Sequence, residues 1–107
     1  MPTTEVEPLD ALGEPMRRAI FERLAERPRA VGELAREFPV SRPAVSQHLK
    51  VLKDARLVMD RPAGNRRIYE IDPAGLRELR DYLEVFWRRA LSAYKAAVEQ
   101  TNSEENE

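Results

Sequence analysis

Apolar residues recur at three- and four-residue intervals through most of this chain, a spacing that places them on one face of a helix. The pattern predicts a short helix over residues 8–12 and a second helix that starts at Pro15 and ends near Pro28. Proline suits the first turn of a helix because no intrahelical bond needs its missing N–H there. A third helix is predicted before Pro39, with an apolar face made of Val31, Leu34, Ala35 and Phe38.

Residues 41–53 predict a fourth helix with two unlike faces. Ser41 is a natural N-cap, and the early Pro43 falls in the first turn. One face carries Val45, Leu49 and Leu52. The opposite face is polar and carries Pro43, Ser46, Gln47 and Lys50, flanked by Arg42 and Lys53. We therefore expect one buried side and one side that is offered to solvent or to a partner.

After Lys53 the helical spacing stops. Residues 57–61 and 67–71 are short runs rich in branched and aromatic side chains, and the Pro-Ala-Gly-Asn of residues 62–65 is typical of a turn. This predicts a β-hairpin whose loop is longer than the tight two-residue kind. Asp72 and Pro73 then start a long final helix that reaches about Gln100. The predicted fold is mainly α with a small β-hairpin (α+β), in the order α-α-α-α-β-β-α.

The length of 107 residues predicts a single domain, 1–107. We expect a body over about residues 8–72, a long C-terminal helix over about 73–100, and disordered acidic ends at 1–7 and 101–107. The chain has no cysteine and therefore no thiolate nucleophile or thiolate metal site. It shows neither a signal peptide nor an apolar run as long as a membrane span, so we expect a cytoplasmic protein with no membrane partner.

Charge is distributed unevenly, although the net charge is only −1. Residues 1–14 and 99–107 hold four acids each and no lysine or arginine, which leaves a net charge of +7 for residues 15–98. Residues 41–70 alone hold seven bases against three acids. A local basic surface is typical of proteins that contact nucleic-acid phosphates, although a solvated surface with acidic ends has the same composition.

The polar face of residues 41–53 carries side chains suited to the major groove of double-stranded DNA. Glutamine bonds an adenine edge bidentately, serine bonds several bases, and lysine and arginine contact phosphate or guanine. Ser46 and Gln47 alone would fit any solvated helix. Beside Arg42, Lys50 and a basic hairpin, they favour the reading of a DNA sequence.

Three segments resemble the arsenical-resistance-repressor (ArsR-type) family of transcription regulators: ALGEPMRRAIFERLAERP, VGELAREFPVSRPAVSQHLKVLKDARLV and GNRRIYEIDPAGL, which together cover about residues 9–76. The resemblance implies a winged helix-turn-helix fold. It also implies a homodimer that occupies operator DNA and represses transcription. Many members of this family leave the DNA when a metal ion binds.

The same resemblance assigns roles to individual residues. The recognition helix begins at its cap, Ser41, and the side chains at base-contacting positions are Arg42, Pro43, Ser46 and Gln47. Lys50 and Lys53 are candidates for phosphate contacts, which fix the register of a protein on DNA. The hairpin becomes a wing that reaches the neighbouring backbone or minor groove, with Arg61, Arg66 and Arg67 as its candidate contacts. The alternative is that these arginines only keep an exposed hairpin soluble.

The chain departs from the family at its metal-sensing positions. Metal-sensing members use cysteines on the first helix of the helix-turn-helix, or carboxylates and histidines on the last helix. Here the first of these helices reads VGELAREF, the last contains no histidine, and the one histidine is His48. We therefore predict no metal site and no cofactor, and a packed, hydrogen-bonded His48. A second departure is Ala30, which stands where serine or threonine often caps a helix, a loss of about 1 kcal/mol.

The final helix carries two apolar seams, which are too broad for so small a body to cover. One seam runs through Leu76, Leu79, Leu83, Phe86, Ala90, Ala93 and Ala97, and the second through Trp87, Leu91, Tyr94 and Val98. We predict that one seam meets a second copy of the chain, aided by Leu9 and Leu12. The predicted dimer interface comprises Leu9, Leu12, Leu79, Leu83, Phe86, Trp87, Ala90, Leu91 and Tyr94. The alternatives are that both seams pack on the chain's own core, or that the aromatic residues line a small-molecule pocket.

Taken together, these patterns predict a sequence-specific DNA-binding regulator rather than an enzyme. The predicted partners are double-stranded DNA and a second copy of the chain, and the predicted activity is repression at a partly palindromic operator without a metal response. Two alternatives stay open: a winged-helix module that binds another protein, and a sensor of the same fold that responds to a small molecule.

Overall fold

The computed structural model describes residues 7–105, and within that range four helices precede the first long strand. They are α1 (Pro8–Ala11), α2 (Pro15–Glu26), α3 (Val31–Glu37) and α4 (Arg42–Asp54). Their order agrees with the prediction, while α1 and α2 end one and two residues before the predicted ends. Prolines lie in the first turns of α1, α2 and α4, where their missing N–H is not needed.

Side chains cap the helix starts that the sequence singled out. The Ser41 Oγ accepts a hydrogen bond from the Ala44 N–H at 3.2 Å, as the N-cap prediction required. At α3 the Ala30 side chain offers no cap, as expected, but Glu33 accepts a hydrogen bond from the Ala30 N–H at 3.1 Å. This bond is the main reason that the pKa of Glu33 is lowered, with Arg27 adding to it. Half of a capping box therefore replaces the missing hydroxyl.

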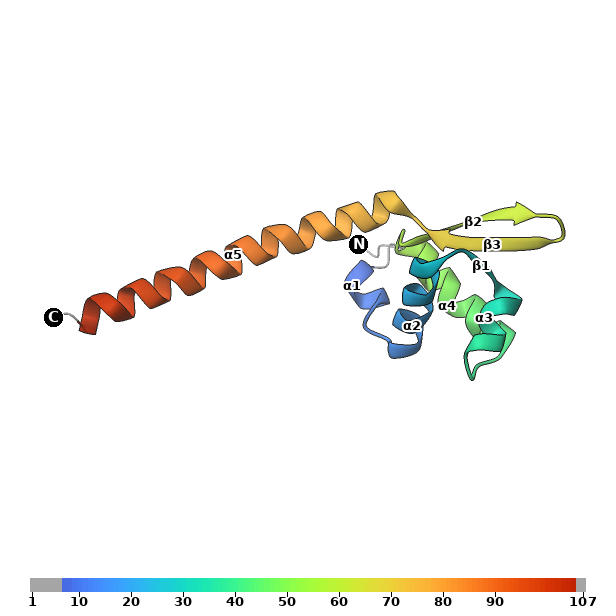
Figure 1. The fold of residues 1–107 in the computed structure, drawn as a ribbon, viewed down its shortest axis with the longest axis horizontal. Helices are drawn as coiled ribbons and strands as arrows, with labels where there is room; N and C mark the ends of the chain where they lie inside the picture. The colour runs from blue at the N-terminus through green and yellow to red at the C-terminus, as the bar shows by residue number, and fades with distance from the viewer. Residues whose placement is uncertain (1–6, 106–107) are drawn as a thin grey trace, which may run out of the picture. The chain divides into compact units, whose positions relative to one another are not determined.

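A three-stranded antiparallel sheet follows, made of β1 (Arg29–Ala30), β2 (Val58–Ala63) and β3 (Arg66–Ile71), in the order β1-β3-β2. The sequence predicted a two-stranded hairpin and missed β1, because a two-residue strand carries no alternation. The hairpin loop was also predicted wrongly. Ala63 pairs with Arg66, so the loop has two residues, and Gly64 supplies the positive φ (65°) that such a tight turn needs. Figure 1 shows the hairpin of β2 and β3 projecting beyond α3.

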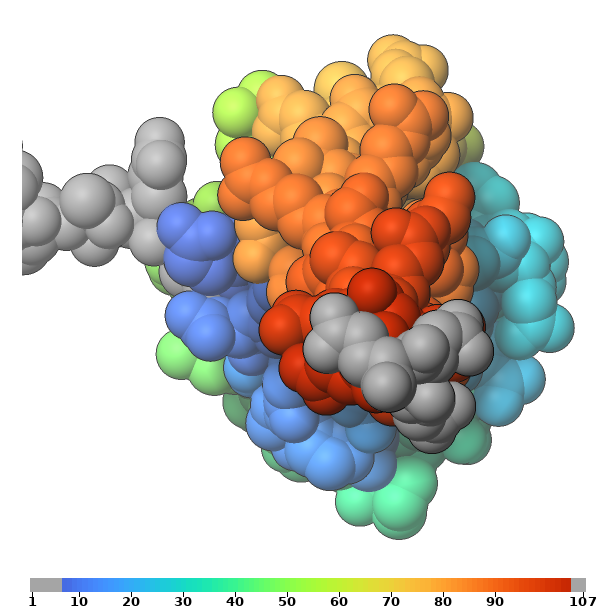
Figure 2. Space-filling view, turned by 90° about the vertical axis from the view of Figure 1, so that its left-hand side faces the viewer, coloured from blue at the N-terminus to red at the C-terminus, as the bar shows by residue number. Residues whose placement is uncertain are grey.

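The core lies where α2, α3 and α4 meet the sheet. Its largest fully buried side chains are Ile20, Leu34, Val45, Leu49, Leu52, Leu57 and Val58. The three from α4 are the apolar face that the sequence predicted, and burying each contributes about 1.5–3 kcal/mol. Figure 2 shows α1 and α3 on opposite sides of this body. The buried face of α4 fixes which of its side chains point outward.

The end of α4 is tied to the start of the last helix. Arg56 adopts a left-handed φ of 64°, and the Leu57 N–H bonds the Leu52 carbonyl at 3.0 Å, as in a Schellman motif. The Arg56 carbonyl then lies so close to Gly75 that a Cβ at residue 75 would be 1.5 Å from its oxygen. Glycine at residue 75 therefore lets the two backbones meet.

The last helix, α5 (Pro73–Glu105), begins where the sequence predicted, with Asp72 accepting a hydrogen bond from the Ala74 N–H. Its 33 residues make a helix about 50 Å long. It continues past Gln100, so residues 101–105 are helical rather than disordered; residues 1–6 and 106–107 lie outside the described range. By its contacts the chain divides into a compact body ending at Leu76 and a helical unit from Arg77 onward.

Candidate nucleic-acid interface

Helix α4 presents a polar face to solvent, opposite its buried stripe. All seven residues that the sequence assigned to this face are exposed: Ser41, Arg42, Pro43, Ser46, Gln47, Lys50 and Lys53. The side chains of Ser46 and Gln47 have no hydrogen bond to any other residue in the described part of the chain, so their polar groups are available to a ligand. The structure thus brings together, on one accessible surface, the side chains that the sequence predicted there.

Two of the cations on this face are already paired within the chain. The Lys50 Nζ lies 3.0 Å from the Asp54 carboxylate, one helical turn further on. The Lys53 Nζ lies 2.9 Å from the Asp60 carboxylate on β2. Lys53 is therefore tied to β2 through the largely buried Asp60, whereas the Lys50 pair is exposed on both sides and holds its lysine only weakly.

Asp60 is a carboxylate that binds two cations, and the sequence analysis missed it. Its side chain is 7% exposed and receives both Lys53 and the Arg67 Nε, the latter at 2.6 Å. The hydrogen bonds from Lys53 and then from Arg67 hold the pKa of Asp60 below its ordinary value, and the same pairing raises the pKa of Lys53. Asp60 thereby links the end of α4 to the hairpin. The β-register offered a signal, because Pro62–Arg67 pairing puts Asp60 and Arg67 on one face of the sheet.

The three hairpin arginines differ in their surroundings. Arg61 lies 3.4 Å from Glu70 across the strands, and Arg67 is bound to Asp60. Arg66, beside the two-residue turn, has no ion pair with any residue in the described range. All three are exposed, and Arg66, beside the tip of the hairpin, is the one of the three without an ion pair in the described range.

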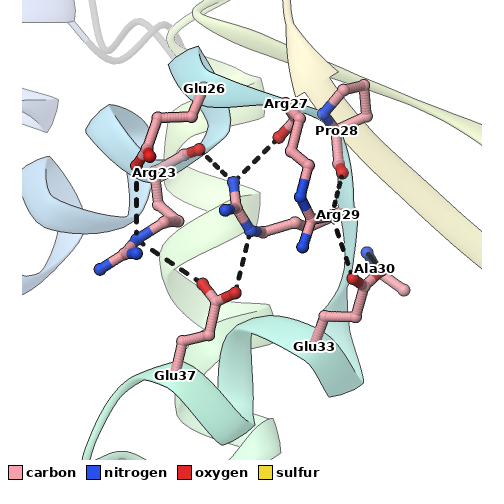
Figure 3. A network of polar contacts seen from close by, with 8 residues as sticks. All are labelled: Arg23, Glu26, Arg27, Pro28, Arg29, Ala30, Glu33 and Glu37. Atoms are coloured by element: carbon pink, nitrogen blue, oxygen red, sulfur yellow. Dashed lines mark hydrogen bonds and ion pairs between the residues drawn. The ribbon is translucent and has the colours of Figure 1, made fainter.

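A buried arginine joins the end of α2 to α3, and sequence analysis missed it as well. Arg29 is 5% exposed, and Figure 3 shows its guanidinium between the end of α2 and the side of α3. It donates to Glu37 at 3.1 Å, to the Arg27 carbonyl at 3.1 Å and to the Arg23 carbonyl. In the sequence Arg29 looks like any other surface arginine, because its burial depends on partners from other elements.

His48 is half-buried with 21% of its side chain exposed, as its place near the buried stripe predicted. Its predicted hydrogen bond is not found: the Nδ1 lies 3.7 Å from the Glu14 carboxylate, which is beyond hydrogen-bond range. No group of three or more metal-ligating side chains occurs among residues 7–105. Nor does any helix in that range have the length and apolar character needed to cross a membrane.

The helical unit from Arg77 onward carries large apolar side chains in solvent. Phe86, Trp87 and Tyr94 are 60%, 62% and 69% exposed, and Leu83 and Leu91 are 44% and 49% exposed. Of the other predicted interface residues, Ala90 is exposed, Leu79 is 9% exposed, Leu9 in α1 is 48% exposed and Leu12 is half-buried. An exposed apolar surface of this extent is typical of an interface with another molecule.

Known proteins match most of this chain. A family model described as a helix-turn-helix domain matches residues 12–61. The HTH-type transcriptional regulator Rv2034 of Mycobacterium tuberculosis is 65% identical over 89 residues, which are 83% of each chain. The crystal structure of a possible transcriptional regulator for arsenical resistance has a TM-score of 0.70 at 40% identity and covers 81% of this chain and 95% of that one. The homodimeric winged helix-turn-helix DNA-binding domain Mb0332 of Mycobacterium bovis, a possible ArsR-family regulator, has a TM-score of 0.60 at 29% identity, over 73% and 72% of the two chains.

Proposed function

We propose that this chain, which belongs to the ArsR-type family of winged helix-turn-helix transcription regulators, is a homodimeric repressor of a partly palindromic operator. The observation that carries the proposal is the exposed face of α4. Its buried stripe of Val45, Leu49 and Leu52 leaves Ser46 and Gln47 pointing outward, without partners in the described part of the chain.

Ser46 and Gln47 read base edges in the major groove. Gln47 offers one acceptor and two donors, which match the N6 and N7 atoms of adenine. Arg42 and Pro43 lie in the first turn, and the Ser41 cap fixes the direction in which that turn enters the groove. Lys50 and Lys53 flank this surface and contact phosphates, exchanging their carboxylate partners for the DNA backbone.

The hairpin acts as a wing beside α4. Arg66 at its tip and Arg61 and Arg67 along its strands meet the backbone or the minor groove next to the major groove that α4 occupies. Because Asp60 binds both Lys53 and Arg67, the wing keeps a fixed position relative to the recognition helix. This rigidity favours binding, since less freedom is lost when DNA is bound.

The homodimer forms through the apolar surface of α5, together with Leu9 and Leu12 of α1. The exposed Phe86, Trp87 and Tyr94 are too large an apolar surface to leave in water, and a second copy covers them. The homodimeric state of the related M. bovis domain supports this assignment. Two recognition helices about 34 Å apart would then enter successive major grooves on one side of the duplex.

The repressor works in the cytoplasm, where the DNA is, without catalysis and without a transition-metal effector. The absence of cysteine and the presence of one histidine, in the sequence itself, support the statement on metals. Repression follows from an occupied operator, which excludes the polymerase.

The experiment that tests the proposal selects a preferred duplex from a random pool and then compares the wild type with Gln47→Ala. We expect the variant to lose about 1–3 kcal/mol of specific binding and to relax its preference at one base position, because a bidentate contact is removed. Gln100→Ala is a matched control, since it removes the same amide from an exposed place on α5. It should keep both the affinity and the preference.

Three results would overturn parts of this function. A wild type that prefers no duplex over random competitor excludes operator binding and favours a protein-binding module. Specific binding that Gln47→Ala leaves unchanged removes Gln47 from the base contacts. A wild type that sediments as a monomer at micromolar concentration excludes the proposed dimer.

A further inference from the structure

A cleft of about 400 Å³ lies between the start of α3, the first turn of α4 and the hairpin. Its lining includes four arginines, Arg36, Arg42, Arg66 and Arg67, with Glu33 as the one acid among them. We call this feature the basic cleft. It lies beside the proposed base-reading face of α4, and Arg36 was not among the residues that the sequence singled out.

The charges of the basic cleft are largely unneutralised. Arg36, Arg42 and Arg66 are exposed, and their side chains form no hydrogen bond or ion pair with another residue in the described range. The acid Glu33 accepts from the Ala30 N–H and pairs with Arg27 at 3.2 Å, and among the cleft arginines Arg66 is close enough to act on its charge without forming an ion pair. Three uncommitted guanidinium groups around one cleft attract an anion, and guanidinium groups bind phosphate bidentately.

Arg42 is directed toward this cleft. Its Nη2 is 3.5 Å and its Cζ 3.6 Å from the position that a Cβ on Gly32 would take, so the guanidinium lies against the first turn of α3. That direction differs from a side chain reaching along α4 into the major groove. The geometry therefore favours a backbone contact for Arg42, rather than the base contact that the family resemblance implied.

A duplex bound as proposed supplies a phosphate at this place. When a helix occupies the major groove and a hairpin occupies the adjacent minor groove, the sugar-phosphate strand that separates the two grooves passes between them. The basic cleft lies between α4 and the hairpin, on that path. We propose that Arg36, Arg42 and Arg66 together hold one phosphate group of this strand; the proposal rests on the proposed DNA-binding function.

The test uses the full chain and its preferred duplex, with binding measured from about 50 to 300 mM salt. We expect Arg36→Gln to make the slope of log K against log salt less steep by part of the value of about 0.9 for one lost phosphate contact, because Arg42 and Arg66 still hold the same phosphate, and we expect loss of all three arginines to remove the full value. The preferred sequence should stay the same, because no base contact is removed. Arg18→Gln is the matched control: Arg18 is exposed on α2 and is not part of the cleft lining, so the variant should keep the wild-type slope.

A second measurement locates the phosphate. Each phosphate of the duplex is replaced in turn by an uncharged methylphosphonate, and binding is measured for the wild type and for Arg36→Gln. We expect one position at which the methylphosphonate costs Arg36→Gln less affinity than it costs the wild type, because one of the three arginines that hold this phosphate is already missing. Additive losses at every position would overturn the assignment.

The remaining outcomes separate this site from the proposed function and from a site for free anions. Specific binding by the wild type, with an unchanged slope for Arg36→Gln, overturns the basic cleft and leaves the regulator function standing. No specific binding by the wild type overturns both. Saturable binding of inorganic phosphate to the free protein that Arg36→Gln abolishes, without any change in DNA binding, would identify a small-anion site and also overturn the proposal.

Discussion

Removing Arg29 should destabilise the helical body without touching the proposed DNA surface. Its guanidinium joins three backbone or side-chain acceptors: Glu37 on α3 and the carbonyls of Arg23 and Arg27 at the end of α2. Figure 3 shows the guanidinium at the centre of this network. Arg29 itself is only 5% exposed. Arg29→Ala removes the donors and leaves their acceptors without this partner at a largely buried position.

The expected loss follows from the burial of the two partners. Breaking a fully buried ion pair costs about 3–5 kcal/mol, because the remaining charge stays without a partner. Glu37 is 27% exposed and also lies 3.6 Å from Arg23, so it keeps some water and one cation. We therefore expect Arg29→Ala to lower the free energy of unfolding by about 2–4 kcal/mol. Arg29→Lys keeps the charge but not the planar fork, and should lose about half as much.

The assay is urea unfolding followed by far-UV circular dichroism at one protein concentration, because dimer formation would otherwise shift the apparent stability. Arg88→Ala is the control, since Arg88 forms an exposed pair with Glu84 at 2.8 Å and should contribute less than about 1 kcal/mol. If Arg29→Ala unfolds at the same urea concentration as Arg88→Ala, with the same m-value, the Arg29 network does not stabilise the fold.

Two further changes test other parts of the fold. Gly75→Ala would place a Cβ 1.5 Å from the Arg56 carbonyl oxygen, so we expect the free energy of unfolding to fall by about 3 kcal/mol or more. Gly32→Ala is the control, because its Cβ would meet only the flexible Arg42 side chain at 3.5 Å. In the same unfolding assay it should change the stability by less than about 1 kcal/mol. Because the folded-state pKa of Asp60 lies below its ordinary 3.8, its contribution to stability is present above that value and lost as the pH falls through the lowered pKa. Asp60→Asn should therefore be less stable at neutral pH and lose stability less steeply between about pH 5 and pH 2; urea midpoints that run parallel to the wild type across this range would contradict the role of Asp60.

Local signals made the helices and their exposed faces predictable. Ser41, Pro43 and the Val45–Leu49–Leu52 spacing act within a few residues of each other, and the structure confirms the cap and the buried stripe. The family resemblance is confirmed by the matching family model and by relatives that share most of the chain. Local signals also explain why Asp72 was placed correctly at the start of α5.

Features that depend on distant partners were not predictable in the same way. Strand β1 exists because Arg29 and Ala30 pair with Tyr69 and Ile68, about forty residues away, and nothing in two residues announces a strand. The burial of Arg29 and Asp60 has the same origin, since each charge is satisfied by residues on other elements. Arg36 was overlooked because it lies outside the basic segment of residues 41–70 and meets the cleft only through the fold.

The pairing of cations within the chain changes how the basic segment should act on DNA. Lys50, Lys53, Arg61 and Arg67 each face a carboxylate of the chain, so a phosphate that binds one of them must replace an existing partner. Such an exchange trades one ion pair for another, and for Lys53 and Arg67 it takes a partner from Asp60, whose side chain is only 7% exposed, so it adds less net attraction than a contact to an unpaired cation. Arg42 and Arg66 have no such partner within the described residues, and a phosphate contact there releases DNA counterions without breaking an ion pair. The paired cations thus mainly fix the geometry of the recognition helix and the hairpin, while the unpaired arginines of the basic cleft supply most of the electrostatic attraction.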